Sequence, residues 1–293
     1  MSEFSFIKNP LTKKWVISAP RRAYRPSIMK GTEHVCPFCP FNEGKEEEYY
    51  RIGGVKGDSD WEVRVISNKF PFAPQHELVI NTREHNNSFT TFSYEQIQRL
   101  FEVYRHRFNE NSHLGQVYIF HNHGQKAGES IPHSHTQIVV IPDKVLLEVP
   151  RREAIINDEK DGLRTSHFTI VSPKSSAWSD EVWIVPQRKK MTFGEATDDE
   201  LSDLADTFLR VIRLYNLRYN SDFPFNFYIY PDGDWYIRII PRVRVLGGFE
   251  VGTNVFVNTQ NPTETMAFLR EHFQTPDVEK IKKEHQAQYH KTV

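Results

Sequence analysis

Two stretches, Gln137-Ile-Val-Val-Ile-Pro142 and Tyr236-Ile-Arg-Ile-Ile-Pro241, decide the fold, because each closes the same series of predicted elements. Each reads as an apolar strand ending in Ile-Pro, and each is preceded by another strand rich in aromatic residues, at 116–120 and 225–230. The two series lie about a hundred residues apart. The chain is therefore expected to contain a duplicated unit.

The helices before these strands repeat as well. A helix is expected to begin at Ser93 and another at Thr197, each with apolar residues at helical spacing. Gln96 and Glu200 stand three residues after those starts, which is the spacing of a capping box. A further strand precedes each helix, at 77–80 and 181–185. Four parallels in the same order indicate a duplication rather than chance.

The fold class that follows is α+β, with two tandem units, antiparallel sheets and helices packed on them. The charged segment 143–161 reads as the connector between the units. We expect one domain at residues 1–160 and a second at 161–293. A stretch near the C-terminus, from Val278 onward, reads as a solvated helix or tail to which we assign no function.

Composition limits the classes of function. The chain of 293 residues is 38% hydrophobic and 26% charged, with a net charge of -1. Such a balance gives no basic excess for binding nucleic acid or an anionic membrane. No apolar run approaches the roughly 20 residues of a membrane span, and the N-terminus lacks the apolar core of a signal peptide. We therefore expect a cytoplasmic protein without nucleic-acid or membrane partners.

The only two cysteines, Cys36 and Cys39, form a CxxC pair. In a reducing compartment such a pair is either half of a zinc site or a redox dithiol. Composition leaves both interpretations open.

The segment from Asn122 to Gln137 carries the chemistry. We expect His133 and His135 to face opposite ways, one toward a metal and the other toward substrate, with Gln137 on the substrate face. A neutral imidazole is a good nucleophile for phosphorus, and the resulting N–P bond splits one transfer into two easier steps. The alternative is a strand with two structural histidines. The second half has Asp232, Asp234 and Tyr236 where the first has His133, His135 and Gln137, so we expect one catalytic centre per chain.

This segment resembles the signature of the galactose-1-phosphate uridylyltransferases, a branch of the histidine-triad superfamily with ADP-glucose phosphorylase-like relatives. The family pattern is N-x-G-x-x-x-G-x-S-x-P-H-P-H-x-Q. The resemblance extends to the opening at residues 9–26, to the cysteine pair, to residues 68–70 and to residues 248–254. The signature matches without a gap at Asn122, Gly124, Gly128, Ser130, Pro132, His133, His135 and Gln137.

The resemblance assigns roles residue by residue. It implies two histidine-triad-like units, of which the first is catalytic and the second degenerate. His135 would be the nucleotidylated residue, and Gln137 and Ser130 would hold the transferring phosphoryl group. The substrate-binding set would comprise Arg22, Arg25, Asn68, Asn122, Gly124 and Gly128.

The resemblance also implies one structural zinc site, made of Cys36, Cys39, His85 and His133. His76 and His34 compete for the histidine positions. No second metal is expected, because relatives often have a H-x-H pair where this chain has Asp234 and Tyr236. Ser134 and Thr136 depart mildly from the common H-P-H-G-Q. Lys69 replaces an acid in the base-binding region, which leaves uracil and adenine open.

The expected function is a two-step nucleotidylyl transfer from a nucleoside diphosphate sugar. The acceptor is a hexose 1-phosphate in a uridylyltransferase, or inorganic phosphate in a phosphorylase of ADP-glucose or dinucleoside polyphosphates. Two further hypotheses are hydrolysis, as in small histidine-triad enzymes, and non-catalytic nucleotide binding. The resemblance implies a homodimer, with the sugar and acceptor pocket partly built from residues 248–253.

Overall fold

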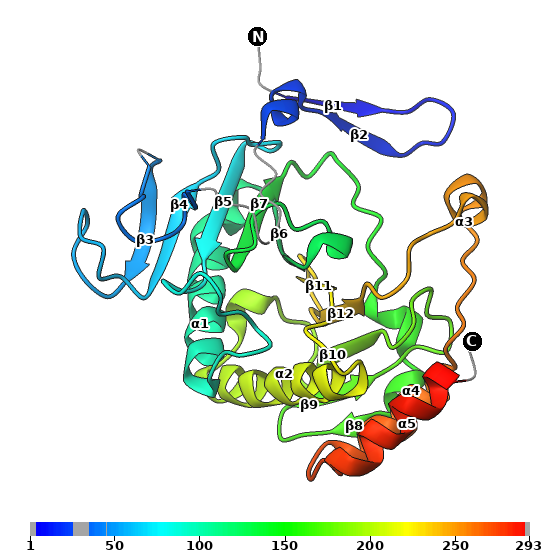
Figure 1. Cartoon of the computed structure of the whole chain (residues 1–293). Helices are drawn as coiled ribbons and strands as arrows, with labels where there is room; N and C mark the ends of the chain where they lie inside the picture. Colours follow the sequence, from blue (N-terminus) through cyan, green and yellow to red (C-terminus); the bar gives the residue numbers. More distant parts are fainter. Residues whose placement is uncertain (1–3, 26–34, 45, 291–293) are drawn as a thin grey trace.

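The fold is built on one continuous antiparallel sheet (Figure 1). The computed structural model describes residues 4–25, 35–44 and 46–290, without the side chains of 286–290. The sheet has ten strands in the order β3-β4-β5-β7-β6-β11-β12-β10-β9-β8. The strands are β3 (Glu48–Ile52), β4 (Val63–Ser67), β5 (Gln75–Ile80), β6 (Gln116–His123), β7 (His135–Ile141), β8 (Leu163–Arg164), β9 (Phe168–Val171), β10 (Val182–Pro186), β11 (Phe225–Ile229) and β12 (Ile237–Pro241).

The strand order makes the duplication visible. Across the sheet, the five strands of the first half come first, in the order β3-β4-β5-β7-β6. The corresponding strands of the second half follow in the reverse order, as β11-β12-β10-β9-β8. The halves join where β6 pairs with β11, in a register that runs from His123 opposite Phe225 to Ile119 opposite Ile229. The two predicted units therefore share one sheet.

The two long helices begin where the sequence predicts. Helix α1 (Tyr94–Asn111) is capped by Ser93, whose side chain accepts from the backbone N–H of Gln96. Helix α2 (Asp198–Arg218) has a complete capping box between Thr197 and Glu200. The first box is only half formed, because the Gln96 side chain donates to the Asn81 carbonyl instead.

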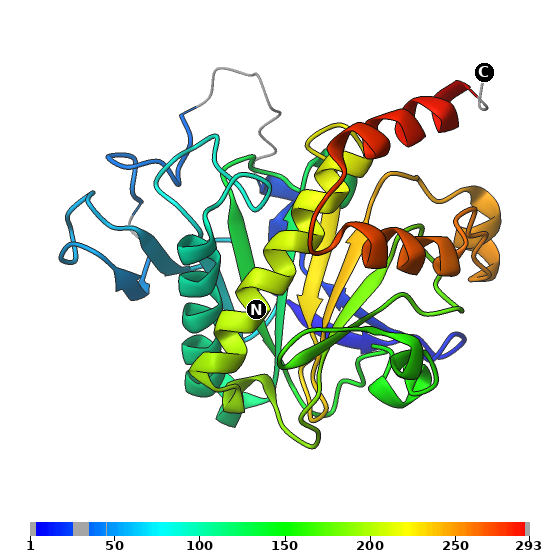
Figure 2. The same cartoon turned by 90° about the horizontal axis from the view of Figure 1, so that it is seen from below.

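These helices cover one face of the sheet, with α4 (Pro262–His272) and α5 (Val278–His290) beside α2 (Figure 2). The core beneath them spans both halves: Phe101, Phe208, Phe227 and Trp235 are fully buried in one continuous cluster. Burial of aromatic side chains of this size stabilises a fold by several kcal/mol in total (about 1.5–3 kcal/mol per large side chain). The two units therefore depend on each other for their core.

The opposite face carries the N-terminal hairpin of β1 (Ser5–Lys8) and β2 (Trp15–Ser18), followed by the short helix η1 (Pro20–Tyr24) (Figure 1). Phe6, Trp15 and Ile17 pack against Val139 and Ile141 of β7. Helix α3 (Gly248–Thr253) lies beyond the second half of the sheet, away from β5 and β7 in both views. The remaining short helices are η2 (Ser112–Leu114), η3 (Gln125–Ala127), η4 (Arg152–Ile155), η5 (Asp158–Asp161) and η6 (Phe193–Glu195). No helix in the described part of the chain is both long enough and apolar enough to cross a bilayer.

Candidate active site

Of the two histidines of the motif, His135 is the first residue of β7, and His133 lies before the strand. We expected residues two apart on an extended segment to face opposite ways, and this reasoning was wrong, since alternation places such residues on the same face. His135 and Gln137 follow that rule, and both line one cavity. His133 faces elsewhere because β7 begins only at His135.

The imidazole of His135 has a defined tautomer. Its Nδ1 lies 2.9 Å from the carbonyl oxygen of His133, which can only accept, so Nδ1 donates and the lone pair stays on Nε2. Burial lowers the pKa of His135, and the nearby Arg25 lowers it further. The ring is therefore neutral at physiological pH, which is the state required of a nucleophile.

The cavity beside His135 has a volume of about 190 Å³. Five of the predicted residues line it together: Arg25, Asn68, Ser130, His135 and Gln137. The cavity also has an apolar wall that was not predicted from the sequence, made of Pro37, Phe38, Ile66, Phe70, Leu78 and Ile131. The ring of Phe38 contacts that of His135, at 5.2 Å between centroids. The available signal for this contact in the sequence was the position of Phe38 between the two cysteines. Glu46 and Lys69 add one charge of each sign to the lining.

Arg22 supports the cavity from behind rather than lining it. Its Nη1 donates to the carbonyl oxygen of Phe70 at 2.7 Å, and its guanidinium lies 4.8 Å from the centroid of the Phe72 ring. Burial, and then the neighbouring Arg25, lower the pKa of Arg22 to about 10. The guanidinium remains charged at neutral pH, so the two arginines together place positive charge beside the cavity.

Asn122 and the glycine loop lie at the end of β6. The Asn122 side chain accepts from Asn226 of β11 at 2.8 Å. Gly124 and Gly128 have φ values of 81° and 87°, which non-glycine residues rarely adopt. Their N–H groups donate to Glu129 and to the Gln125 carbonyl, so both are used within the loop. Their direct contact with substrate stays a prediction.

Cys36, Cys39, His85 and His133 form a cluster whose ligand atoms all lie within 4.8 Å of one another. The Cys39 Sγ is 3.3 Å from Nδ1 of His85 and 3.5 Å from Nδ1 of His133. A tetrahedral zinc ion separates its ligand atoms by roughly 3.5 Å, given bond lengths of about 2.0–2.3 Å. The His133 Nε2 donates to the Thr82 carbonyl at 2.7 Å, which directs the Nδ1 lone pair at the cluster. The four residues therefore fit a zinc ion.

The competing histidines are placed differently. His76 lies against Gln137 and Asn68, not against the cysteines, and His34 lies outside the described residues. Within the described residues, the Cys/His cluster is the one group of three or more His, Cys, Asp or Glu side chains with metal-binding geometry. In the second half, Tyr236 stacks on Trp183 at 4.1 Å between centroids.

The departures Ser134 and Thr136 belong to a buried polar network beside His135. The Asn81 amide donates to both hydroxyls, at 3.0 and 3.2 Å. The Tyr104 hydroxyl lies 2.7 Å from that of Thr136. His121 donates from Nδ1 to the His135 carbonyl at 2.8 Å, and burial holds its pKa well below the ordinary value. This network fixes the start of β7, which carries His135.

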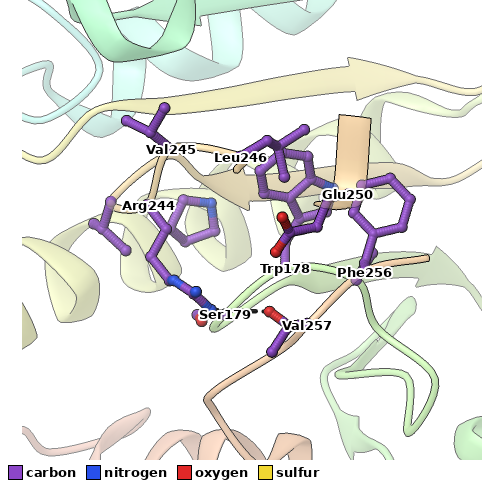
Figure 3. A pocket seen from close by; sticks show the side chains of 11 residues that line it. Trp178, Ser179, Arg244, Val245, Leu246, Glu250, Phe256 and Val257 are labelled. Atoms are coloured by element: carbon purple, nitrogen blue, oxygen red, sulfur yellow. Dashed lines mark hydrogen bonds between the residues drawn. The ribbon is translucent and has the colours of Figure 1, made fainter. Parts of the chain in front are cut away.

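The region predicted to build the acceptor pocket encloses little space in one chain. Glu250 and Phe256 close on Trp178 around a cavity of about 20 Å³ (Figure 3). That volume holds a water molecule, not a sugar. Arg244 donates to the Val257 carbonyl at 2.9 Å, so its guanidinium supports the loop itself.

The chain is similar in sequence and in fold to known proteins. Residues 21–144 match a family model described as the N-terminal domain of a domain of unknown function, DUF4931. ADP-glucose phosphorylase of Arabidopsis thaliana is 25% identical over 90% of this chain and 92% of the relative. Galactose-1-phosphate uridylyltransferase of Thermotoga maritima is 25% identical over 90% of this chain and 96% of the relative. The crystal structure of the Arabidopsis ADP-glucose phosphorylase with bound ADP-glucose has a TM-score of 0.70 at 25% identity, covering 92% of this chain and 99% of that one.

Over 90% of its length the chain is homologous to a galactose-1-phosphate uridylyltransferase and to an ADP-glucose phosphorylase. It also shares the fold of solved structures of both kinds. The resemblance seen in the sequence and the predicted α+β fold are thereby confirmed. So is the expected enzyme class, because these homologues are nucleotidyltransferases.

Proposed function

We propose that the protein transfers a nucleoside monophosphate from a nucleoside diphosphate sugar to a phosphate acceptor through a nucleotidyl-His135 intermediate. The observation that carries this proposal is the hydrogen bond from Nδ1 of His135 to the His133 carbonyl oxygen. That bond leaves the nucleophilic lone pair on Nε2 of a neutral ring in the wall of the cavity.

In the first step, Nε2 attacks the α-phosphorus and an N–P bond forms. The bond from that phosphorus to the bridging oxygen breaks, and the sugar 1-phosphate leaves with the electron pair. In the second step, an oxygen of the acceptor phosphate attacks the same phosphorus and the N–P bond breaks. Arg25 and the Gln137 amide line the cavity, where they are suited to stabilise charge on the phosphoryl oxygens.

The main proposal for the acceptor is a hexose 1-phosphate, with UDP-glucose as donor. The alternative is inorganic phosphate, with ADP-glucose or a dinucleoside polyphosphate as donor. One specific observation supports this alternative: the uridylyltransferase and the ADP-glucose phosphorylase have the same sequence identity to this chain, 25%. Lys69 in the cavity wall, where uridylyltransferases have an acid, gives a further reason to test both bases.

We further propose that zinc is held by Cys36, Cys39, His85 and His133, on the basis of their mutual distances. When bound, the ion would tie the loop carrying Phe38 to the segment before His135. Residues 1–160 would supply the nucleophile and this cluster, and residues 161–293 the supporting half. A cytoplasmic location remains a proposal from composition.

A homodimer is also proposed. Helix α3 lies away from β7 in the single chain, so only a second copy could bring residues 248–253 over the nucleophile. Exposed apolar residues on and beside this segment support an interface: Val245, Phe249, Val251 and Val255 are each more than half exposed. Light scattering after gel filtration would test this, and a monomer would contradict it.

The decisive experiment is intact mass measurement under alkaline conditions, which preserve phosphoramidates. The protein is incubated separately with UDP-glucose and ADP-glucose, without acceptor, and His135→Ala is the control. A mass gain of one UMP or AMP, absent in the variant, supports the covalent mechanism and identifies the base.

Galactose 1-phosphate or inorganic phosphate is then added to the adduct, and the acceptor that discharges it distinguishes transferase from phosphorylase. No adduct with either sugar nucleotide would overturn the proposal. Free UMP or AMP accumulating instead would indicate a hydrolase.

A further inference from the structure

His76 lies beside the nucleophile and has no role in the proposed transfer. It is on β5, where Leu78 pairs directly with Gln137 of β7. Because side chains alternate along a strand, His76 shares the face of Leu78 and reaches the Gln137 side chain diagonally. The His76 Nε2 is 3.0 Å from Oε1 of Gln137, and the imidazole is almost fully buried.

The tautomer of His76 is decided by a backbone group. The N–H of Phe72 points at Nδ1 of His76, with a nitrogen–nitrogen distance of 3.3 Å. A backbone N–H can only donate, so Nδ1 must accept and the ring proton must be on Nε2. Burial lowers the pKa of His76 to about 3, so the ring keeps this single proton at neutral pH.

Asn68 also reaches Nε2, at 3.0 Å. Its Oδ1 accepts from the backbone N–H of Phe70 at 2.9 Å, so its Nδ2 faces the ring. A neutral imidazole can accept from this amide or from the Phe72 N–H, but not from both. A proton on Nε2 satisfies the Phe72 N–H and the Gln137 Oε1, whereas a proton on Nδ1 satisfies only Asn68, so we assign the ring proton to Nε2.

A protonated Nε2 determines the orientation of the Gln137 amide. The donor on His76 must face the carbonyl oxygen Oε1, and this leaves the –NH2 group of Gln137 for the cavity that it lines. With the amide reversed, a carbonyl oxygen would face the phosphoryl oxygens and repel them. A glutamine has no preferred end of its own, so this selection has to come from a neighbour.

We propose that His76 is a positioning residue of the active site, which holds Gln137 so that its amide nitrogen donates to the transferring phosphoryl group. The inference rests on the proposed function, in which Gln137 contacts that group. His76 itself touches neither the substrate nor the reacting atoms.

The test is a double-mutant cycle. His76→Leu removes the donor, and His76→Gln retains an N–H donor on a side chain of similar reach. Each is made in the wild-type and in the Gln137→Ala background, and the rate of nucleotidyl-His135 formation is measured for all variants. Zinc content and unfolding temperature are recorded to monitor folding.

His76→Leu is expected to slow adduct formation on the order of tenfold, as for loss of one aligned hydrogen bond. His76→Gln should restore most of the rate, and His76→Leu should have no further effect once Gln137 is alanine. An equal loss in both backgrounds would show a merely structural role and overturn the proposal.

A second readout separates this inference from the proposed function. Equilibrium affinity for UMP and AMP is measured across the same cycle, and needs no covalent step. If the wild-type protein forms no adduct, the proposed function fails, while coupling between His76 and Gln137 in nucleotide affinity still supports the inference. Absence of coupling in both readouts overturns it.

Discussion

The Asn226 Nδ2 donates a hydrogen bond to Oδ1 of Asn122 at 2.8 Å, across the seam where β11 pairs with β6. The Oδ1 of Asn226 in turn accepts from Nη1 of Arg242 at 2.8 Å. A guanidinium can only donate, so Arg242 fixes which end of Asn226 faces Asn122. The second half of the chain lacks the histidine motif, but it orients Asn122 of the first half, which we predict to bind substrate.

Asn226→Asp is expected to slow nucleotidyl-His135 formation by about tenfold, the cost of roughly one hydrogen bond. The carboxylate would keep the contact with Arg242 but would place an oxygen against Oδ1 of Asn122, so that the Asn122 amide turns. The rate is measured by intact mass over time, with the unfolding temperature as the control for folding. An unchanged rate would show that the orientation of Asn122 does not matter for transfer.

The polar network behind β7 predicts a loss of stability in Tyr104→Phe. The Tyr104 hydroxyl, which is fully buried, bridges Thr136 and Asn81 at 2.7 and 3.2 Å. Removing it leaves buried polar partners unsatisfied, which costs about 1–3 kcal/mol of the free energy of unfolding. Urea denaturation measures this loss.

Tyr94→Phe is the matched control for that experiment, because the Tyr94 hydroxyl contacts the Ser202 side chain in a partly buried position. Its loss of stability should be smaller than that of Tyr104→Phe. Equal effects of the two substitutions would indicate that the network contributes nothing beyond an ordinary surface hydrogen bond.

The sequence predicted those features that depend on local signals. The caps at Ser93 and Thr197, together with the apolar periodicity, predicted both long helices. The signature predicted that His135 and Gln137 lie in one site, and both line one cavity. The pairing of β6 with β11 was not predictable, because nothing around Asn122 indicates a partner about a hundred residues away.

The orientation of side chains could not be predicted from the sequence either. His133 and His135 face different ways because β7 begins only at His135. If both had been in the strand, alternation would have placed them on the same face. The role that we propose for His76 depends on a backbone N–H four residues earlier in the chain, at Phe72. Such contacts arise only when the tertiary structure brings the groups together.

Metal analysis should find one zinc ion per chain, and Cys39→Ser should abolish stoichiometric binding. Three ligands of a Cys2His2 set hold zinc much less tightly than four, and the unfolding temperature should fall as the cross-link is lost. Adduct formation should also slow, because Phe38 between the cysteines contacts the His135 ring. His76→Gln is the control and should retain zinc. A wild-type protein purified without metal, or full binding without Cys39, would contradict this prediction.

The stability of the protein should fall with decreasing pH, and His76 should account for a measurable part of the slope. Burial lowers the pKa of His76 from 6.5 to about 3 in the folded chain. Between these values the unfolded chain binds a proton that the folded chain does not, so stability is present above about pH 6.5 and is lost as pH falls toward about 3. One such group contributes a slope of up to about 1.4 kcal/mol per pH unit. His76→Gln removes the titrating group, so its free energy of unfolding, measured in urea across this window, should decline less steeply than that of the wild type. Parallel curves for the two proteins would mean that the imidazole is not buried in its neutral form.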